Sequence, residues 1–149
     1  MVEARPGPSL DHPWLPDTAW PVLAPFWEAL ARGSLAFPRC TGCGRFQWYP
    51  QAMCPRCRAM DFEWTDVEGT GRVFTFTVVR QAFLPEFADR LPTTVALVEV
   101  GAAPGVRLVT NVLTADRRDA AGRVAVGDLV DIEVEEVSPG VFLPFAVLR

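Results

Sequence analysis

The sequence predicts a mainly β protein in three consecutive parts, and one observation supports each part. Residues 1–33 form a proline-rich arm that ends in a short helical pattern. Residues 34–67 hold all four cysteines, as two C-x2-C pairs that predict a zinc ribbon. Residues 68–149 hold five strand patterns separated by turn residues, which predict a closed five-stranded barrel.

The cysteines are the most specific signal in the chain. Cys40 and Cys43 form one pair, and Cys54 and Cys57 form the other. Each pair can form a tight turn that points two thiolates at one tetrahedral metal ion. Flanking prolines disfavour a thioredoxin-type redox pair, and disulfides are disfavoured because the chain lacks an apolar signal peptide. We therefore expect a structural Zn²⁺ whose four thiolate ligands leave no open position for catalysis.

The composition excludes several classes of function. Apolar residues make up 50% of the 149 residues, which suffices for a core, but no apolar run reaches the roughly 20 residues that span a bilayer. All 14 basic residues are arginine, so no lysine is present for Schiff-base chemistry. The net charge of −4 argues against nucleic acid as a partner. We expect a cytoplasmic protein that binds neither a membrane nor nucleic acid.

Residues 1–22 contain five prolines and predict an extended arm. Its aromatic residues, including Trp14 and Trp20, would lie either across the protein's own surface or on a partner subunit. His12, the only histidine, is also in this arm and is expected to be solvated. Pro25–Gly33 predicts a helix too short to be stable alone, so it must dock on something. The candidate residues for docking on a partner are Phe26, Trp27 and Leu30.

Short strands are expected around the cysteine turns, at residues 35–37, 46–49 and 62–64, as in a rubredoxin-like ribbon. Four of the 14 arginines lie on or beside these turns: Arg39, Arg45, Arg56 and Arg58. We favour the interpretation that they offset the charge of roughly −2 that four thiolates leave on a divalent ion. The alternative is that they also attract phosphate groups.

The barrel strands are expected at residues 71–80, 93–100, 106–113, 129–137 and 141–148. In the first strand, Phe74 and Phe76 are expected on one face and Val73 and Thr75 on the other, with both faces fairly apolar. Residues 115–126 predict a loop at the place where an OB-fold barrel connects its third and fourth strands. The pattern therefore predicts an OB-fold barrel.

The loop between the first two barrel strands, residues 81–92, contains large apolar residues. OB-folds often bind ligands through this loop. Its apolar side chains would either plug the end of the barrel, which is the commoner case, or form an adhesive patch or a rim for an apolar ligand. The candidate contact residues are Phe83, Leu84 and Phe87.

Three motifs follow one another in a specific order. The helix carries Pro25-Phe26-Trp27-Glu28, the ribbon carries the two cysteine pairs, and the barrel begins with Gly69-x-Gly71-x-Val73. In this order, over about residues 23–148, they resemble the zinc-ribbon and OB-fold acyl-CoA-associated proteins, also called domain of unknown function 35. Each motif alone would be a weak signal.

The resemblance implies an accessory role. In bacterial steroid side-chain degradation, members pair with a thiolase-like aldolase that cleaves a CoA-linked intermediate, or are fused or bound to a MaoC-type hydratase. In archaea they bridge acetoacetyl-CoA thiolase and hydroxymethylglutaryl-CoA synthase. A thiolase-like partner and an acyl-CoA ligand of the complex are therefore implied. The residues agree, because thiolase chemistry needs a free cysteine nucleophile and the metal ion takes all four cysteines.

The leading hypothesis is a non-catalytic subunit that completes the CoA-thioester site of such a complex. The four ribbon arginines would then steer the phosphates of coenzyme A. One alternative is a subunit of a MaoC-type enoyl-CoA hydratase. Another is a single-strand nucleic-acid binder whose barrel aromatics, such as Phe74 and Phe76, stack on bases, although the acidic barrel half argues against it. A free-standing enzyme ranks lowest.

Overall fold

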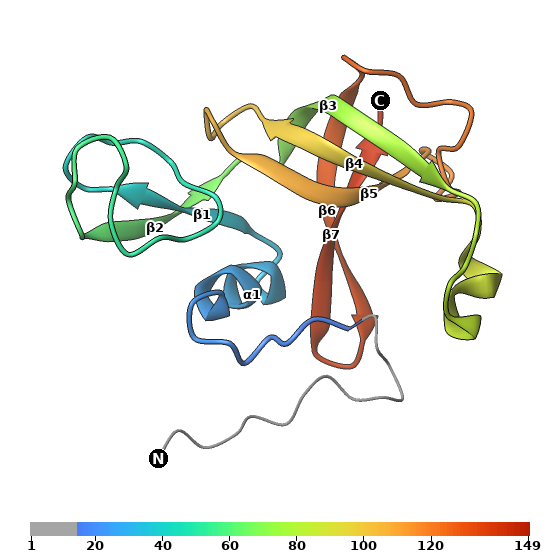
Figure 1. The fold of residues 1–149 in the computed structure, drawn as a ribbon, viewed down its shortest axis with the longest axis horizontal. Coiled ribbons are helices and arrows are strands. Elements are labelled where there is room, and N and C mark those ends of the chain that lie inside the picture. Colours follow the sequence, from blue (N-terminus) through green and yellow to red (C-terminus); the bar gives the residue numbers. More distant parts are fainter. Residues whose placement is uncertain (1–14) are drawn as a thin grey trace.

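A computed structural model describes residues 15–149, so most of the proline-rich arm, including His12 and Trp14, lies outside the described residues. The described chain forms a short helix, a two-stranded ribbon sheet and a closed five-stranded barrel. Figure 1 shows the ribbon at one side of the barrel, with helix α1 near both. This arrangement confirms the expected mainly β fold.

Helix α1 (Ala24–Ala31) connects the ribbon to the barrel. Pro25 lies in its first turn, and the helix ends before Gly33, whose φ of +74° brings the N–H of Ser34 back to the carbonyl of Ala29 at 2.9 Å. Phe26 and Leu30 are 3% and 0% exposed, and the helix contacts strands of both the ribbon and the barrel. Its apolar face is therefore covered by the chain's own core.

The ribbon sheet consists of β1 (Leu35–Cys40) and β2 (Phe62–Val67), which pair antiparallel. The strand expected at residues 46–49 is wrong, because this described segment forms only an isolated bridge between Phe46 and Arg39. Pro50 has no N–H and restricts Tyr49, so the pairing ends after the bond from Gln47 N–H to the carbonyl of Pro38.

The barrel strands lie close to their expected positions: β3 (Thr70–Val79), β4 (Thr93–Val100), β5 (Arg107–Leu113), β6 (Leu129–Ser138) and β7 (Val141–Leu148). Their order is β3-β4-β5-β7-β6, and β3 pairs with β6 to close the barrel. The parallel pairing of β5 with β7 is confined to residues 111–113 and 145–147. Before that point the two strands diverge, and α1 packs beside β7.

A β-bulge in β3 changes the expected alternation of its side chains. The register with β4 shifts between Val73 and Thr75, so Val73 is 1% exposed while the next residue, Phe74, is 41% exposed. The guanidinium of Arg107 lies 3.6 Å from the centre of the Phe74 ring and also pairs with Glu99. Phe74 therefore does not share a face with Phe76 as the sequence suggested.

One apolar core extends through all three parts of the described chain. It joins Phe26 and Leu30 of the helix, Phe37 of the ribbon, and barrel residues such as Val98 and Val130. The loop after β3 contains a short 3-10 helix, η1 (Pro85–Arg90), with no buried residue. No helix among residues 15–149 is long and apolar enough to cross a membrane.

Candidate functional site

The four cysteines converge at the outer end of the ribbon. Their Sγ atoms all lie within 4.8 Å of one another, with 3.5 Å between Cys40 and Cys57 and 3.7 Å between Cys43 and Cys54. Sulfur ligands about 2.3 Å from a tetrahedral metal ion are separated by about 3.8 Å. The donor set and its spacing therefore fit one tetrahedral metal ion.

Two matching backbone turns place these thiols. Gly44 N–H donates to the carbonyl of Cys40 at 2.8 Å, and Arg58 N–H donates to the carbonyl of Cys54 at 2.9 Å. Gly44 and Arg58 occupy the same position of their turns, and both have left-handed φ values, +72° and +63°. The turns are thus near-copies, and each aims two sulfur atoms at a common centre.

The surroundings of the thiols shift the pKa values of two of them in opposite directions. Backbone N–H groups, first that of Cys57, lower the pKa of Cys54 to about 6. The N–H of Ala59 also stabilises the Cys57 thiolate, but the neighbouring thiols, first Cys40, together with burial raise the pKa of Cys57 to about 11. Four adjacent thiolates need a cation between them, and a divalent metal ion supplies that charge.

The four arginines of the ribbon lie on or beside the cysteine turns, where the sequence favours a role in offsetting the thiolate charge. Arg39 Nε donates to the carbonyl of Gly44 at 2.9 Å and lies over the Phe46 ring. All four side chains are exposed. Within residues 15–149, ion pairs involve Arg32 and four barrel arginines, and no carboxylate pairs with Arg39, Arg45, Arg56 or Arg58. The ribbon therefore presents guanidinium groups without carboxylate partners beside its metal centre.

The loop at residues 81–92 forms an apolar patch. Phe83 is 88% exposed and Leu84 is 48% exposed, whereas Phe87 is only partly exposed. These residues line a hollow of about 310 Å³ together with Val79 and Leu91. Because Phe83 and Leu84 are exposed to solvent, the loop does not plug the barrel with these side chains but offers a surface.

Helix α1, which the sequence suggested would dock on a partner, packs instead against its own chain. Phe26 and Leu30 are buried in the chain's own core, so they present no surface to another protein. Trp27 is partly exposed and packs edge-to-face on Phe26, with 5.1 Å between ring centroids. The helix therefore joins parts of its own chain.

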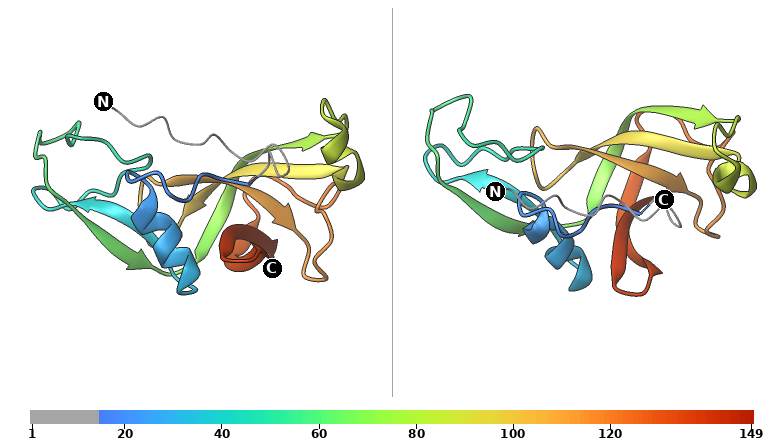
Figure 2. Two further views of the ribbon diagram at one scale, coloured as in Figure 1. Left: turned by 90° about the horizontal axis from the view of Figure 1, so that it is seen from below. Right: turned by 60° about the horizontal axis from the view of Figure 1, so that its bottom comes forward.

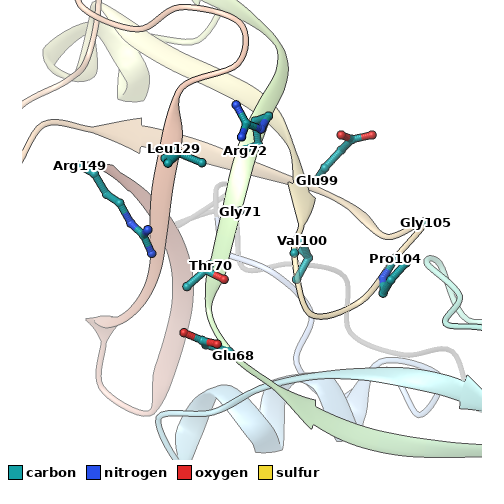
Figure 3. A pocket seen from close by; sticks show the side chains of 11 residues that line it. Glu68, Thr70, Gly71, Arg72, Glu99, Val100, Pro104, Gly105, Leu129 and Arg149 are labelled. Carbon is teal, nitrogen blue, oxygen red and sulfur yellow. The ribbon is translucent and has the colours of Figure 1, made fainter.

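A further hollow of about 550 Å³ lies where the ribbon enters the barrel (Figure 3). Arg72 on its wall donates to the carbonyl of Gly127 at 2.7 Å, and the hydrogen bond with Asp131 raises the pKa of Arg149. Both guanidiniums already have acceptors within the protein, so we assign no ligand here. Sequence reasoning missed this hollow because its residues come from separate strands and share no motif.

Fold and metal centre together define a zinc-ribbon and OB-fold protein. Residues 27–63 match the family described as "ChsH2, rubredoxin-like zinc ribbon domain", and residues 64–135 match "ChsH2, C-terminal OB-fold domain". The chain belongs to the ChsH2 family of DUF35 proteins. This confirms the resemblance inferred from the sequence.

Two curated relatives carry functional names. A Thermomonospora curvata protein named "Probable enoyl-CoA hydratase alpha subunit" is 32% identical over 120 residues, which is 80% of this chain. A Methanocaldococcus jannaschii "DUF35 domain-containing scaffold protein" is 33% identical over 63 residues, which is 42% of this chain. The matched stretches span 35% and 44% of these relatives' own lengths.

Solved structures also resemble this chain. A chain of an "Ltp2-ChsH2(DUF35) aldolase" superposes with a TM-score of 0.74 at 29% identity, covering 86% of this chain and 94% of that chain. A DUF35 protein of unknown function from Sulfolobus solfataricus has a TM-score of 0.59 at 16% identity, covers 87% of each chain, and shows the shared fold. The chain thus resembles a subunit of an aldolase complex.

Proposed function

We propose that this chain is a non-catalytic subunit of a thiolase-like aldolase that acts on an acyl-CoA, such as a CoA-linked intermediate of steroid side-chain degradation. The observation that carries the proposal is its similarity to a chain of the Ltp2-ChsH2 aldolase over 94% of that chain's length. The metal ion is zinc, and its role is to fold the ribbon.

Catalytic groups come from the partner. Lysine is absent from the sequence, the only histidine is His12, and the four thiols lie together in the metal cluster. A metal ion held by four thiolates has no open position for a substrate or water. The chain therefore supports the reaction by completing the partner's CoA-thioester site.

Two surfaces support a contact with a partner that carries CoA. The loop patch of Phe83, Leu84 and Phe87 supplies exposed apolar area, as protein interfaces require. The ribbon arginines supply donors for the phosphates of coenzyme A. The patch would anchor the enzyme, and the arginines would meet its ligand.

The complex can be tested by co-purification. The tagged chain should retain a thiolase-like protein from its native cell extract, and the reconstituted pair should co-elute in size-exclusion chromatography. Phe83→Asp should separate the pair without unfolding the chain, because that side chain is 88% exposed. The matched control is Val126→Asp, at a residue 65% exposed in another loop. Elution of the unmodified pair as separate species would refute the proposal.

The CoA contact needs a separate measurement. Replacing Arg39, Arg45, Arg56 and Arg58 by glutamine should raise the KM for a CoA thioester several-fold with little change in kcat, because phosphate contacts lie far from the reacting bond. Arg118→Gln, at an exposed barrel arginine, is the control. An unchanged KM would remove the arginines from the site while leaving the subunit role intact.

A hydratase complex is the second candidate. It is favoured by the 32% identity to part of a protein named as a probable enoyl-CoA hydratase subunit. In that case the tagged chain would retain a MaoC-type protein, and the pair would hydrate an enoyl-CoA. The identity of the retained protein distinguishes the two candidates.

A further inference from the structure

An apolar groove runs along the junction of helix, ribbon and barrel, where β5 and β7 diverge. One hollow of about 160 Å³ is lined by Trp27 of the helix, Tyr49 of the ribbon and Val109 of the barrel, among others. A second hollow, of about 210 Å³, shares Trp27 and is lined also by Thr18 and Phe142. We call these two hollows the junction groove.

Aromatic side chains form part of the walls of the junction groove, and its rim is exposed. Trp48, Phe26 and Phe145 line it together with Pro144. Tyr49 is 57% exposed and Val109 is 55% exposed. Grooves lined by aromatic rings bind proline-rich segments in an extended polyproline conformation, because these flat rings pack against proline rings.

Trp27 brings a hydrogen-bond donor that needs an acceptor to the junction groove. Its indole Nε1 is buried and has no hydrogen-bond acceptor among the described residues. A buried donor without an acceptor is unfavourable, and natural structures nearly always satisfy it. The backbone of a polyproline segment has no internal hydrogen bonds, so its carbonyls are free to accept one.

The chain's own beginning meets these requirements. The described chain starts at Leu15, and Thr18 lines the second hollow. Figure 2 shows the segment before α1 crossing from the helix toward the β6–β7 hairpin. Residues 1–14 contain Pro6, Pro8 and Pro13, and their large apolar side chains include Leu10 and Trp14. A polyproline segment of this length spans about 43 Å, which is enough to run back along the junction.

We propose that residues 1–14 occupy the junction groove of their own chain. A backbone carbonyl of the segment accepts the hydrogen bond from Trp27 Nε1, and Leu10 and Trp14 cover the exposed rim at Tyr49 and Val109. The segment thereby straps helix, ribbon and barrel together. This inference goes beyond the proposed function, because it concerns the isolated chain and needs no partner enzyme.

Hydrogen–deuterium exchange with mass spectrometry tests the strap on the isolated full chain. The amides of residues 1–14 should exchange at least about tenfold more slowly than those of a synthetic peptide of the same sequence. Val109→Asp and Tyr49→Ser should remove this protection, and both positions are more than half exposed, so the core is kept. Val126→Asp should leave the protection unchanged. Wild-type exchange as fast as in the peptide would overturn the proposal.

The indole of Trp27 gives a second readout. In ¹H–¹⁵N NMR spectra, a variant lacking residues 1–14 should shift the Trp27 Nε1–H resonance and speed its exchange with solvent, and the added peptide should reverse both changes. An unshifted resonance would contradict the proposed hydrogen bond.

Sedimentation equilibrium shows whether the segment in the groove comes from the same chain or from a second copy. If the protein forms a dimer, and if dilution removes both the dimer and the slow amide exchange of residues 1–14, the segment of a second copy fills the groove. That result would refute the strap within one chain.

Discussion

Two residues at equivalent positions show how the cysteine turns constrain the sequence. Gly44 and Arg58 each follow the second cysteine of a pair, and both adopt a left-handed backbone conformation. Glycine adopts this conformation freely, whereas a residue with a Cβ pays for it in conformational energy. The first turn therefore has the residue that the backbone favours, and the second does not.

Substitutions at these two positions should differ in their effect on stability. Gly44→Ala should lower the free energy of unfolding of the metal-bound protein by about 1–2 kcal/mol, since φ is +72° there. Arg58→Gly should not lower it, because glycine relieves the same strain. Urea denaturation followed by tryptophan fluorescence measures both. Equal losses in the two variants would contradict this explanation.

The metal ligands give a sharper prediction. Cys57→Ala should abolish stoichiometric zinc and unfold the ribbon, because three thiolates no longer close the tetrahedral site. Metal analysis and the Tm report the two effects. Met60→Ala, at a residue 70% exposed near the same turn, is the control and should keep both values. A Cys57→Ala variant that stayed folded and zinc-loaded would overturn the structural role of the cluster.

Among the elements, β3 explains the two glycines of the motif at its start. A Cβ on Gly71 would lie 2.6 Å from a methyl group of Val98 and 2.7 Å from the carbonyl of Glu99, and a Cβ on Gly69 would lie 2.5 Å from the carbonyl of Ile132. Neighbouring strands thus approach too closely for any side chain. The motif is a packing requirement of the barrel wall.

Gly71→Ala should therefore destabilise the barrel by about 1–3 kcal/mol, because the neighbouring backbone must move. Gly101→Ala is the matched control, since its nearest neighbour would be the Thr70 hydroxyl at 3.5 Å. Thermal denaturation by circular dichroism compares the two variants. A Gly71→Ala variant as stable as Gly101→Ala would show that the wall can relax.

The strands were predictable where turns mark their ends. Pro92 and Gly101 bound β4, Pro139 and Gly140 precede β7, and both strands match their expected residues. The bulge in β3 was not predictable, because it depends on the register with β4 and not on the residue pattern of β3. The segment at residues 46–49 resembles a strand in composition, yet Pro50 ends its pairing with β1 after Gln47.

At the scale of the whole molecule, the continuous core predicts cooperative loss of structure on metal removal. Phe37 of the ribbon and Phe26 of the helix belong to the same core as the barrel valines. A strong chelator should therefore lower the Tm of the barrel as well as unfold the ribbon. Calorimetry should show one transition with zinc and a transition at lower temperature without it. An unchanged barrel transition would show that the ribbon is energetically separate.

The candidate site was predictable only in part. The cysteine spacing predicted the metal ligands, because two C-x2-C pairs this close in sequence are typical of a zinc ribbon and of few other kinds of site. The junction groove was not predictable, since Trp27, Tyr49 and Val109 are distant in sequence and meet only through the packing of three parts. The buried position of Phe26 likewise depends on its packing against Phe37 and Trp48 of the ribbon, which no local pattern reveals.

The divergence of β5 and β7 has a consequence for synthesis. The parallel contact that joins β5 to β7 uses residues 145–147, near the end of β7, so the barrel closes only after almost all of its sequence has left the ribosome. Helix α1 and the ribbon precede every barrel strand and emerge first. A ribbon that has already bound its metal would hold the helix ready, and the newly made β7 would meet an apolar cover instead of water.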